Sequence, residues 1–192
     1  MTVAFVLGNG KSRLAVDPQQ DLLGKGIIYA CNAIYRDFMP NVLISTDKPI
    51  SEKIQLEGIP ARVKHWTRRP LPESQSYKIE RPYYGMSSGP VAISRAAIDG
   101  HSHIYFLGFD LGSNDGRLNN VYGSTEFYKA NTDKATFAGN WIYQINQISR
   151  EFRQAQFVRI TGAESQPVDW ENKFNNLTEM SMDDFKVMIN KL

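Results

Sequence analysis

Short apolar runs alternate along this chain with segments in which apolar residues recur at helical spacing. The runs predict strands at residues 3–7, 27–30, 42–46, 61–66, 103–109 and 157–160. The helical spacing predicts helices at residues 33–38, 51–56 and 139–153, from 90 to just before 100, and from 181 onward. Strands alternating with helices predict the α/β class, as a sandwich with a mainly parallel sheet. Ligands bind such sheets at the carboxyl ends of the strands, so we expect a functional site there.

The domain organisation is simple, because 192 residues suffice for one substantial core. We predict a single domain over residues 1–192. Residues 61–66 mix charged and apolar side chains, which favours an edge strand. Residues 67–86 then form a basic loop broken by prolines, and loops of that length commonly act as lids. Residues 163–192 form a helical tail.

The helix predicted in the tail carries an apolar stripe on one face, formed by Phe185, Met188, Ile189 and Leu192. Two interpretations stay open: the stripe packs on its own domain, or on a second copy in a homo-oligomer. Packing on the same domain is favoured.

The composition is that of an ordinary globular protein, with 42% hydrophobic, 22% charged and 11% aromatic residues. No apolar stretch reaches the roughly 18 residues that a membrane helix needs. The first residues have neither a basic start nor a cleavage site, so we expect a cytoplasmic protein. Cys31 is the single cysteine and is expected to be a small packed residue. His65, His101 and His103 have no further ligand at metal-binding spacing, so zinc is not expected.

Positive charge is concentrated between Arg62 and Arg81, where six Lys and Arg face two acids, although the whole chain carries only +2. Such a stretch suits an anionic substrate or a nucleic acid, while a solvated loop with incidental charge explains it equally well. Aromatic residues lie in or beside it, and they would provide stacking surfaces for single-stranded nucleic acid: Trp66, Tyr77, Tyr83 and Tyr84.

The first glycine-marked segment is Leu7-Gly8-Asn9-Gly10-Lys11-Ser12, directly after a predicted buried strand. It is not a phosphate-binding P-loop, because Phe5 stands where that motif needs a glycine. It is not a dinucleotide fingerprint either, because Arg13 replaces the third small residue. What remains is a tight turn whose glycines let a ligand approach the backbone beside the Asn9 amide; a plain turn is the alternative.

The second segment is Ser87-Ser88-Gly89-Pro90, at the start of a predicted helix, with Ser88 near the N-cap. Free amides at a helix start favour a phosphate or carboxylate ligand. Helix capping alone explains the serines equally well.

Two aspartates, Asp47 and Asp110, each follow a predicted buried strand. Each is suited to hold Mg²⁺ or to accept hydrogen bonds from sugar hydroxyls. Aspartate is also a common turn former in this position, and both interpretations stay open.

In order along the chain, four motifs resemble those of bacterial lipooligosaccharide sialyltransferases and of the related MptE-like hydroxymethyl-dihydropterin pyrophosphokinases: Val6-Leu7-Gly8-Asn9-Gly10-x-Ser12, Cys31-Asn32-x-Ile34-Tyr35, Ser87-Ser88-Gly89, and Ile104 to Asp110. The resemblance implies a single-domain, Rossmann-like three-layer sandwich that binds a cytidine monophosphate sugar. It implies that Gly8, Asn9 and Gly10 line the phosphate and sugar of the donor. Asn32, Ser88 and Gly89 would contact the donor, and Asp110 would shape the nucleotide pocket.

The chain departs from the sialyltransferase pattern at the catalytic residues. That family uses a histidine downstream of the Asp110 motif as general base, and here no histidine follows His103. It also uses two tyrosines of the following loop to support the leaving phosphate, and Tyr122 is a candidate for one of them. Asp47 stands where that family tends to have an asparagine.

These observations favour a transferase that binds a nucleotide or nucleotide sugar. Asp47 or Asp110 would be its acidic group, and Tyr122 or the Arg68-Arg69 loop would steady the phosphate. One alternative is pyrophosphate transfer from ATP with Mg²⁺. Another is a non-catalytic module that binds a nucleotide or a nucleic acid.

Overall fold

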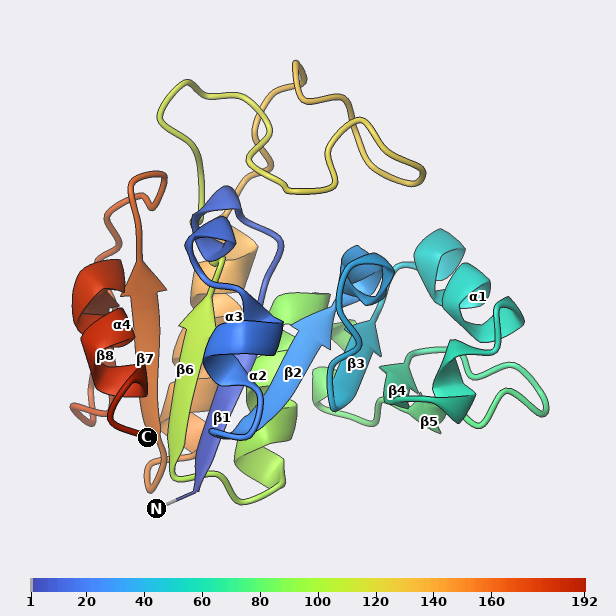
Figure 1. Cartoon of the computed structure of the whole chain (residues 1–192), viewed down its shortest axis with the longest axis horizontal. Coiled ribbons are helices and arrows are strands. Elements are labelled where there is room, and N and C mark those ends of the chain that lie inside the picture. The colour runs from blue at the N-terminus through green and yellow to red at the C-terminus, as the bar shows by residue number, and fades with distance from the viewer. Residues whose placement is uncertain (1) are drawn as a thin grey trace.

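A single all-parallel sheet of eight strands forms the centre of the computed structural model, which describes residues 2–192 (Figure 1). The spatial order is β5-β4-β3-β2-β1-β6-β7-β8. The strands are β1 (Val3–Leu7), β2 (Ile27–Cys31), β3 (Val42–Ser45), β4 (Lys64–Thr67), β5 (Tyr77–Lys78), β6 (His103–Leu107), β7 (Gln156–Thr161) and β8 (Leu177–Ser181). The predicted α/β, Rossmann-like single-domain sandwich is confirmed.

Helices cover both faces of the sheet and make the outer two layers. They are α1 (Lys48–Leu56), α2 (Ser88–Ile98), α3 (Gly139–Glu151) and α4 (Met182–Ile189). Apolar residues of α2 and α3 share one core cluster with Ala4 and Val6 of β1. Those of α1 and α4 share the opposite cluster with Phe5 and Leu7. Successive side chains of β1 thus enter different cores, which explains why the strand is apolar throughout.

The strand order reverses beside β1, which pairs with β2 on one side and with β6 on the other. The chain therefore leaves β1 toward one half of the sheet and returns at β6 to build the other half. Loops that diverge at such a switch point open a crevice at the carboxyl ends of the strands.

Two short strands were not predicted, and both add to the edges of the sheet. β5 lies within residues 67–86 and pairs with β4 through Trp66 and Tyr77, so β4 is not the edge strand that its charges indicated. β8 lies within the tail, which is therefore not wholly helical. Its only buried residue is Leu177, so the apolar alternation that marks a strand is weak there.

The tail helix α4 packs on its own domain, as the favoured interpretation held. Phe185 and Ile189 are buried in the core that also contains Phe5, whereas Leu192 is 52% exposed and lies outside that core. Cys31 is buried, as expected. None of the helices in residues 2–192 has both the length and the apolar character needed to span a membrane.

The long connection between β6 and α3 crosses above the carboxyl ends of the strands (Figure 1). Residues 111–138, all described, contain no regular helix or strand beyond an isolated bridge between Arg117 and Lys134. Irregular segments of this length in compact domains are commonly functional. This segment, rather than residues 67–86, covers the switch point.

Candidate functional site

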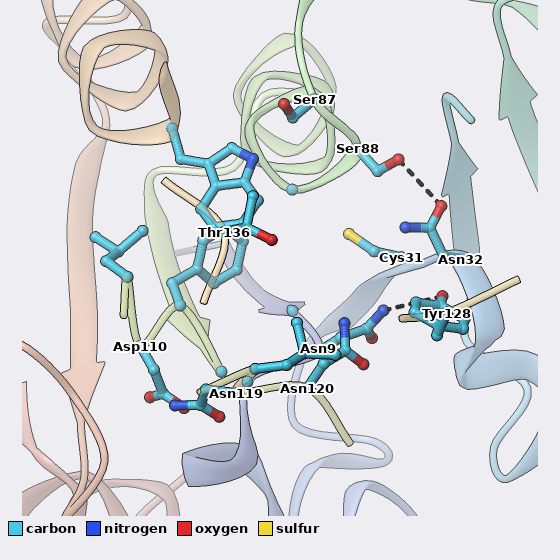
Figure 2. Close-up of a pocket in the computed structure, with 18 of the residues that line it drawn as sticks. Asn9, Cys31, Asn32, Ser87, Ser88, Asp110, Asn119, Asn120, Tyr128 and Thr136 are labelled. Carbon is cyan, nitrogen blue, oxygen red and sulfur yellow. Dashed lines mark hydrogen bonds between the residues drawn. The ribbon is translucent and has the colours of Figure 1, made fainter. Parts of the chain in front are cut away.

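A cavity of about 460 Å³ lies at the carboxyl ends of the strands, beneath residues 111–138. We call it the main cavity. Asn9 after β1 and Ser88 at the start of α2 both line it, as predicted from segments far apart in the sequence (Figure 2). The other predicted site residues on its wall are Gly8, Gly10, Asn32, Asp47, Arg68, Ser87, Gly89 and Asp110.

The Ser88 hydroxyl connects three segments of the cavity wall, and its bond to Asn32 is drawn in Figure 2. It donates to Asn32 Oδ1 over 3.1 Å, lies 2.8 Å from Thr46 Oγ1, and accepts from the Thr46 amide over 3.0 Å. Asn32 has a left-handed backbone, with φ of 53°, directly after β2. Asparagine tolerates this conformation better than most residues, and the Ser88 bond fixes its side chain with Nδ2 facing the cavity.

The N-terminus of α2 opens into the main cavity without a side-chain cap. Ser87 occupies the N-cap position and its amide donates to Gln144 Oε1 over 2.9 Å. Ser88 is the first helical residue, next to the N-cap as predicted. The amides of Ser88 and Gly89 have no acceptor within the described chain. They are free donors at the positive end of the helix dipole.

Gly8 and Gly10 are required by the protein backbone rather than by a ligand. Their amides donate to the carbonyl oxygens of Leu107 and Gly108, each over 2.8 Å. A Cβ on Gly8 would lie 2.6 Å from the Gly108 oxygen, and one on Gly10 would lie 2.5 Å from Asp110 Oδ2. The turn after β1 is therefore pressed against the turn after β6, and these two amides are not available to bind phosphate.

Asn9 has a buried side-chain oxygen, Oδ1, without a hydrogen-bond partner among residues 2–192. Its Nδ2 donates to the Tyr128 hydroxyl over 3.4 Å. The Tyr128 oxygen also accepts from the Ala33 amide. Burial raises the pKa of Tyr128 to about 12, so its hydroxyl remains protonated at neutral pH.

Asp110 has a structural role that the sequence did not reveal. It is only 3% exposed, and its carboxylate accepts from the Ser12 amide, Asn119 Nδ2 and the Ser165 hydroxyl. These donors hold three loops together around the carboxylate, for which the sequence had left a ligand-binding and a turn-forming role open. Ser12 itself is buried and lies off the cavity wall. Within residues 2–192, no three His, Cys, Asp or Glu side chains gather as a metal site.

Tyr122, the tyrosine expected at the site, is buried away from the main cavity. Its hydroxyl donates to Asp37 Oδ2 over 2.6 Å and accepts from Arg13 over 2.8 Å. Tyr128 of the same segment lines the cavity instead. Both tyrosines follow Asp110 in one irregular loop, and no sequence signal distinguishes them.

Aromatic and apolar side chains also line the main cavity. They come from the loop after β6, from residues 111–138 and from the start of α3: Phe109, Leu111, Leu118, Phe127 and Trp141. Leu111, Leu118 and Phe127 could not be placed at the site from sequence, because an irregular loop gives no periodic signal. Among the residues of the predicted lid, 67–86, Arg68 alone reaches the main cavity.

The basic residues of the predicted phosphate loop are divided between two cavities. Arg68 lines the main cavity, and its guanidinium donates to the carbonyl oxygens of Tyr84 and Met86 over 2.6 and 2.7 Å. Arg69 lies instead on a second cavity of about 130 Å³. Asp47 lines both cavities.

The aromatic residues proposed as nucleic-acid platforms are engaged by their neighbours. Trp66 stacks on Tyr77 with ring centres 5.1 Å apart, and the Arg95 guanidinium lies 4.7 Å from the Trp66 ring centre. The Tyr83 hydroxyl donates to Glu151 over 2.6 Å. Tyr77 and Tyr84 are nevertheless exposed, and the nucleic-acid alternative stays a prediction.

An all-parallel sheet with a ligand-sized cavity at its switch point defines a Rossmann-like α/β protein with a candidate binding site. Comparisons with protein-family models, with curated proteins and with solved structures found no match. The resemblance to sialyltransferases and pyrophosphokinases therefore stays a prediction.

Proposed function

We propose that this protein binds a nucleotide or nucleotide sugar in the main cavity, with a phosphate at the N-terminus of α2. The observation that carries this proposal is the uncapped helix start. Two free amides, of Ser88 and Gly89, face a cavity that also contains Asn9 and Asn32. Helix N-termini bind phosphate because these amides and the helix dipole act together.

The charges around the α2 N-terminus support an anionic ligand. Arg68 lines the same wall, and no Asp or Glu within residues 2–192 forms an ion pair with it. Its hydrogen bonds to carbonyl oxygens fix the guanidinium without neutralising it. Lys129 adds a second positive group from the covering segment. A phosphate would thus be contacted by the free amides of α2, by the fixed guanidinium of Arg68 and by the ammonium group of Lys129.

The remaining walls match the other parts of a nucleotide. Asn32 Nδ2 is a free donor that faces the cavity, so this side suits ribose or sugar hydroxyls. The aromatic side chains of the lining, Phe109 and Trp141 among them, suit the face of a base. The cavity volume is within the range of about 300 to 1,000 Å³ typical of small-molecule sites.

The chemistry that fits this arrangement is transfer of the group attached to the phosphate. Phosphate held by amides, Arg68 and the protonated Tyr128 hydroxyl would leave readily, because these groups stabilise the charge that develops on it. The proposed class is therefore a transferase that uses a nucleotide-activated donor, in agreement with the resemblance to sialyltransferases.

Calorimetric titration tests the binding step. The protein is titrated with cytidine, uridine and adenosine monophosphates, and with the corresponding nucleosides. We expect binding of at least one nucleotide, and much weaker binding of its nucleoside, because the nucleoside has no phosphate for α2. An absence of heat with every nucleotide, with and without Mg²⁺, would refute the proposal.

A nearly isosteric variant sharpens this test. Asn32→Asp retains the oxygen that accepts from Ser88 but replaces the free donor with a negative charge. Losing one hydrogen bond to a charged group costs about 1.5 to 3 kcal/mol, so affinity should fall about tenfold or more. Asn190→Asp makes the same charge change at an exposed position after α4 and should bind like the wild type.

A further inference from the structure

The second cavity adjoins the main cavity at the carboxyl ends of β3 and β4. The two share Thr46, Asp47 and Arg68. The rest of the second cavity is formed by Lys48, Ser51, Glu52, Thr67 and Arg69, from the first turns of α1 and the end of β4. A group bound there would lie next to a ligand in the main cavity.

Asp47 on this shared wall has an exposed and unengaged carboxylate. It occupies the N-cap position of α1 but makes no side-chain capping bond. Within residues 2–192 the carboxylate takes part in no hydrogen bond or ion pair, and only its backbone carbonyl is used, by the Ser51 amide. Asp110, in contrast, is buried and accepts three hydrogen bonds. Asp47 is therefore free to exchange a proton with a ligand.

Other ionisable groups on the main cavity are poorly suited to accept a proton. Burial raises the pKa of the Cys31 thiol and of the Tyr128 hydroxyl to about 12 each, so both hold their protons at neutral pH. Arg68 and Lys129 are cations. Among the described residues that line this cavity, Asp47 is left as the accessible base.

The charges of the second cavity favour an anionic occupant. Lys48 is paired with Glu52 at 3.7 Å, whereas no carboxylate within residues 2–192 pairs with Arg68 or Arg69. The uncapped start of α1 adds the positive end of a helix dipole. With Asp47 facing the reacting group, Arg69 would hold a carboxylate or phosphate of the same molecule, while Arg68 faces the donor phosphate.

We infer that the second cavity is an acceptor site for a hydroxyl compound that carries an anionic group, and that Asp47 is the general base of the transfer. This inference rests on the proposed function. The acceptor hydroxyl gives its proton to the Asp47 carboxylate, and its oxygen forms a bond to the donor carbon. The bond from that carbon to the phosphate oxygen breaks, and the electron pair stays on the phosphate at α2.

The experiment separates binding from turnover in the full chain. Wild type and Asp47→Asn are titrated with nucleoside monophosphates, and nucleotide release is then measured from CMP-N-acetylneuraminic acid, UDP-glucose and GDP-mannose. Glucuronic acid and neutral lactose serve as acceptors. The exposed carboxylate of Glu80 lies outside both cavities, so Glu80→Gln is the matched charge control.

We expect Asp47→Asn to bind nucleotide at least as tightly as wild type and to lose about 100-fold or more of its turnover, the usual contribution of a general base. Arg69→Gln should raise the KM for the acidic acceptor without changing nucleotide affinity. A wild type that binds nucleotide but releases none from any donor, or an Asp47→Asn variant that turns over normally, overturns this inference and leaves the proposed function standing. Absence of nucleotide binding by the wild type overturns both.

Discussion

Ser88 and Asn32, 56 positions apart in the sequence, are joined by a hydrogen bond of 3.1 Å between the serine hydroxyl and the asparagine carbonyl oxygen. The same hydroxyl accepts from the Thr46 amide, so it connects the start of α2 with the ends of β2 and β3. Three segments of the cavity wall are thus positioned by one oxygen atom. The N-terminus of α2 and the Asn32 side chain are set relative to each other before any ligand binds.

Replacing this hydroxyl should destabilise the protein. Ser88→Ala leaves the buried Thr46 amide and Asn32 Oδ1 without a partner, and we expect a loss of about 1 to 3 kcal/mol in the free energy of unfolding, measured with urea. Ser87→Ala is the control, because the neighbouring hydroxyl makes no hydrogen bond within the described chain. Equal effects of the two substitutions would contradict the role given to Ser88.

The contact between the turns after β1 and β6 should not accept a methyl group. Gly10 has φ of −65°, which alanine tolerates, so any effect of Gly10→Ala arises from the clash with Asp110 Oδ2 and the Gly108 oxygen. We expect a loss of about 1 to 3 kcal/mol. In the control, Gly85→Ala, the added carbon meets no atom within 4 Å, and stability should change by less than about 0.5 kcal/mol. A fully stable Gly10→Ala would show that the two turns are not in tight contact.

Arg159 supports the site from beneath. Its fully buried guanidinium donates to the carbonyl oxygens of Phe109 and Asp110 and forms a 2.8 Å ion pair with Glu179 of β8. Arg159→Met leaves these acceptors unpaired, so unfolding by denaturant should require about 3 to 5 kcal/mol less. The exposed Arg62→Met variant should unfold like the wild type. If Arg159→Met unfolds like Arg62→Met, the turn after β6 does not depend on this arginine.

Stability should fall in mild acid because of His65, which is buried between the hydroxyls of Ser45 and Ser76. Burial lowers the pKa of His65 from 6.5 to about 4, so in the folded state it stays neutral where the unfolded chain takes up a proton. Its contribution is therefore complete above pH 6.5 and is lost between pH 6.5 and 4, by about 3 kcal/mol in total. The free energy of unfolding of the wild type, minus that of His65→Gln, should decrease as the pH is lowered from 6.5 to 4. A difference that is independent of pH would contradict the assignment.

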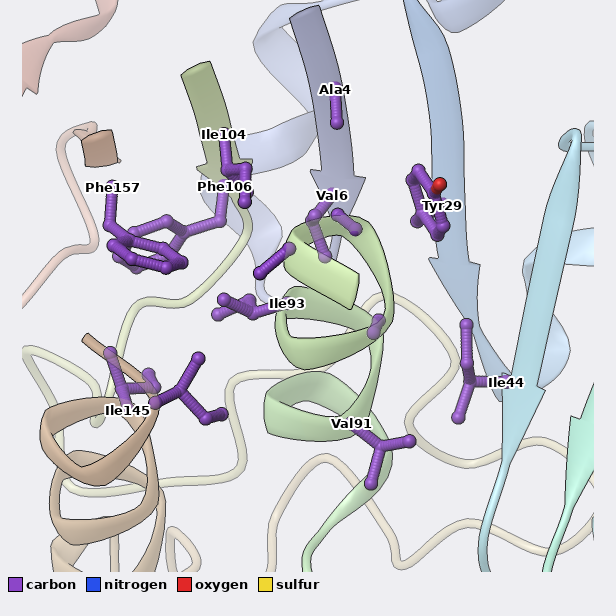
Figure 3. Close-up of a cluster of buried hydrophobic side chains, with 14 of the residues drawn as sticks. Ala4, Val6, Tyr29, Ile44, Val91, Ile93, Ile104, Phe106, Ile145 and Phe157 are labelled. Atoms are coloured by element: carbon purple, nitrogen blue, oxygen red, sulfur yellow. The ribbon is translucent and has the colours of Figure 1, made fainter. Parts of the chain in front are cut away.

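The central part of the fold could be predicted because its signals are local and strong. Ala4 and Val6 of β1 share a buried core with Val91 and Ile93 of α2, and the residues of the strand fill this core or the opposite one in turn (Figure 3). The edges carried no such signal. β5 has two residues, and β8 has one buried side chain, so their places are set by pairing with a neighbouring strand rather than by their own sequence.

The candidate site was predictable where it depends on strand ends and unpredictable where it depends on long-range contacts. Asn9, Asn32, Asp47 and Ser88 follow or face strands of one parallel sheet, so the topology alone brings them together. The partners that occupy Asp110 come from distant loops, and so does the backbone that requires the glycines. No sequence pattern near Asp110, Gly8 or Gly10 encodes these contacts.

Phosphate binding at the start of α2 can be observed directly at the amides of Ser88 and Gly89. The amide resonances of isotope-labelled protein are assigned by NMR and followed during titration with the tightest-binding nucleotide and then with the matching nucleoside. We predict that both amides shift strongly with the nucleotide and little with the nucleoside, because only the phosphate reaches the start of α2. A nucleotide that binds while these two resonances stay in place would contradict the proposed site.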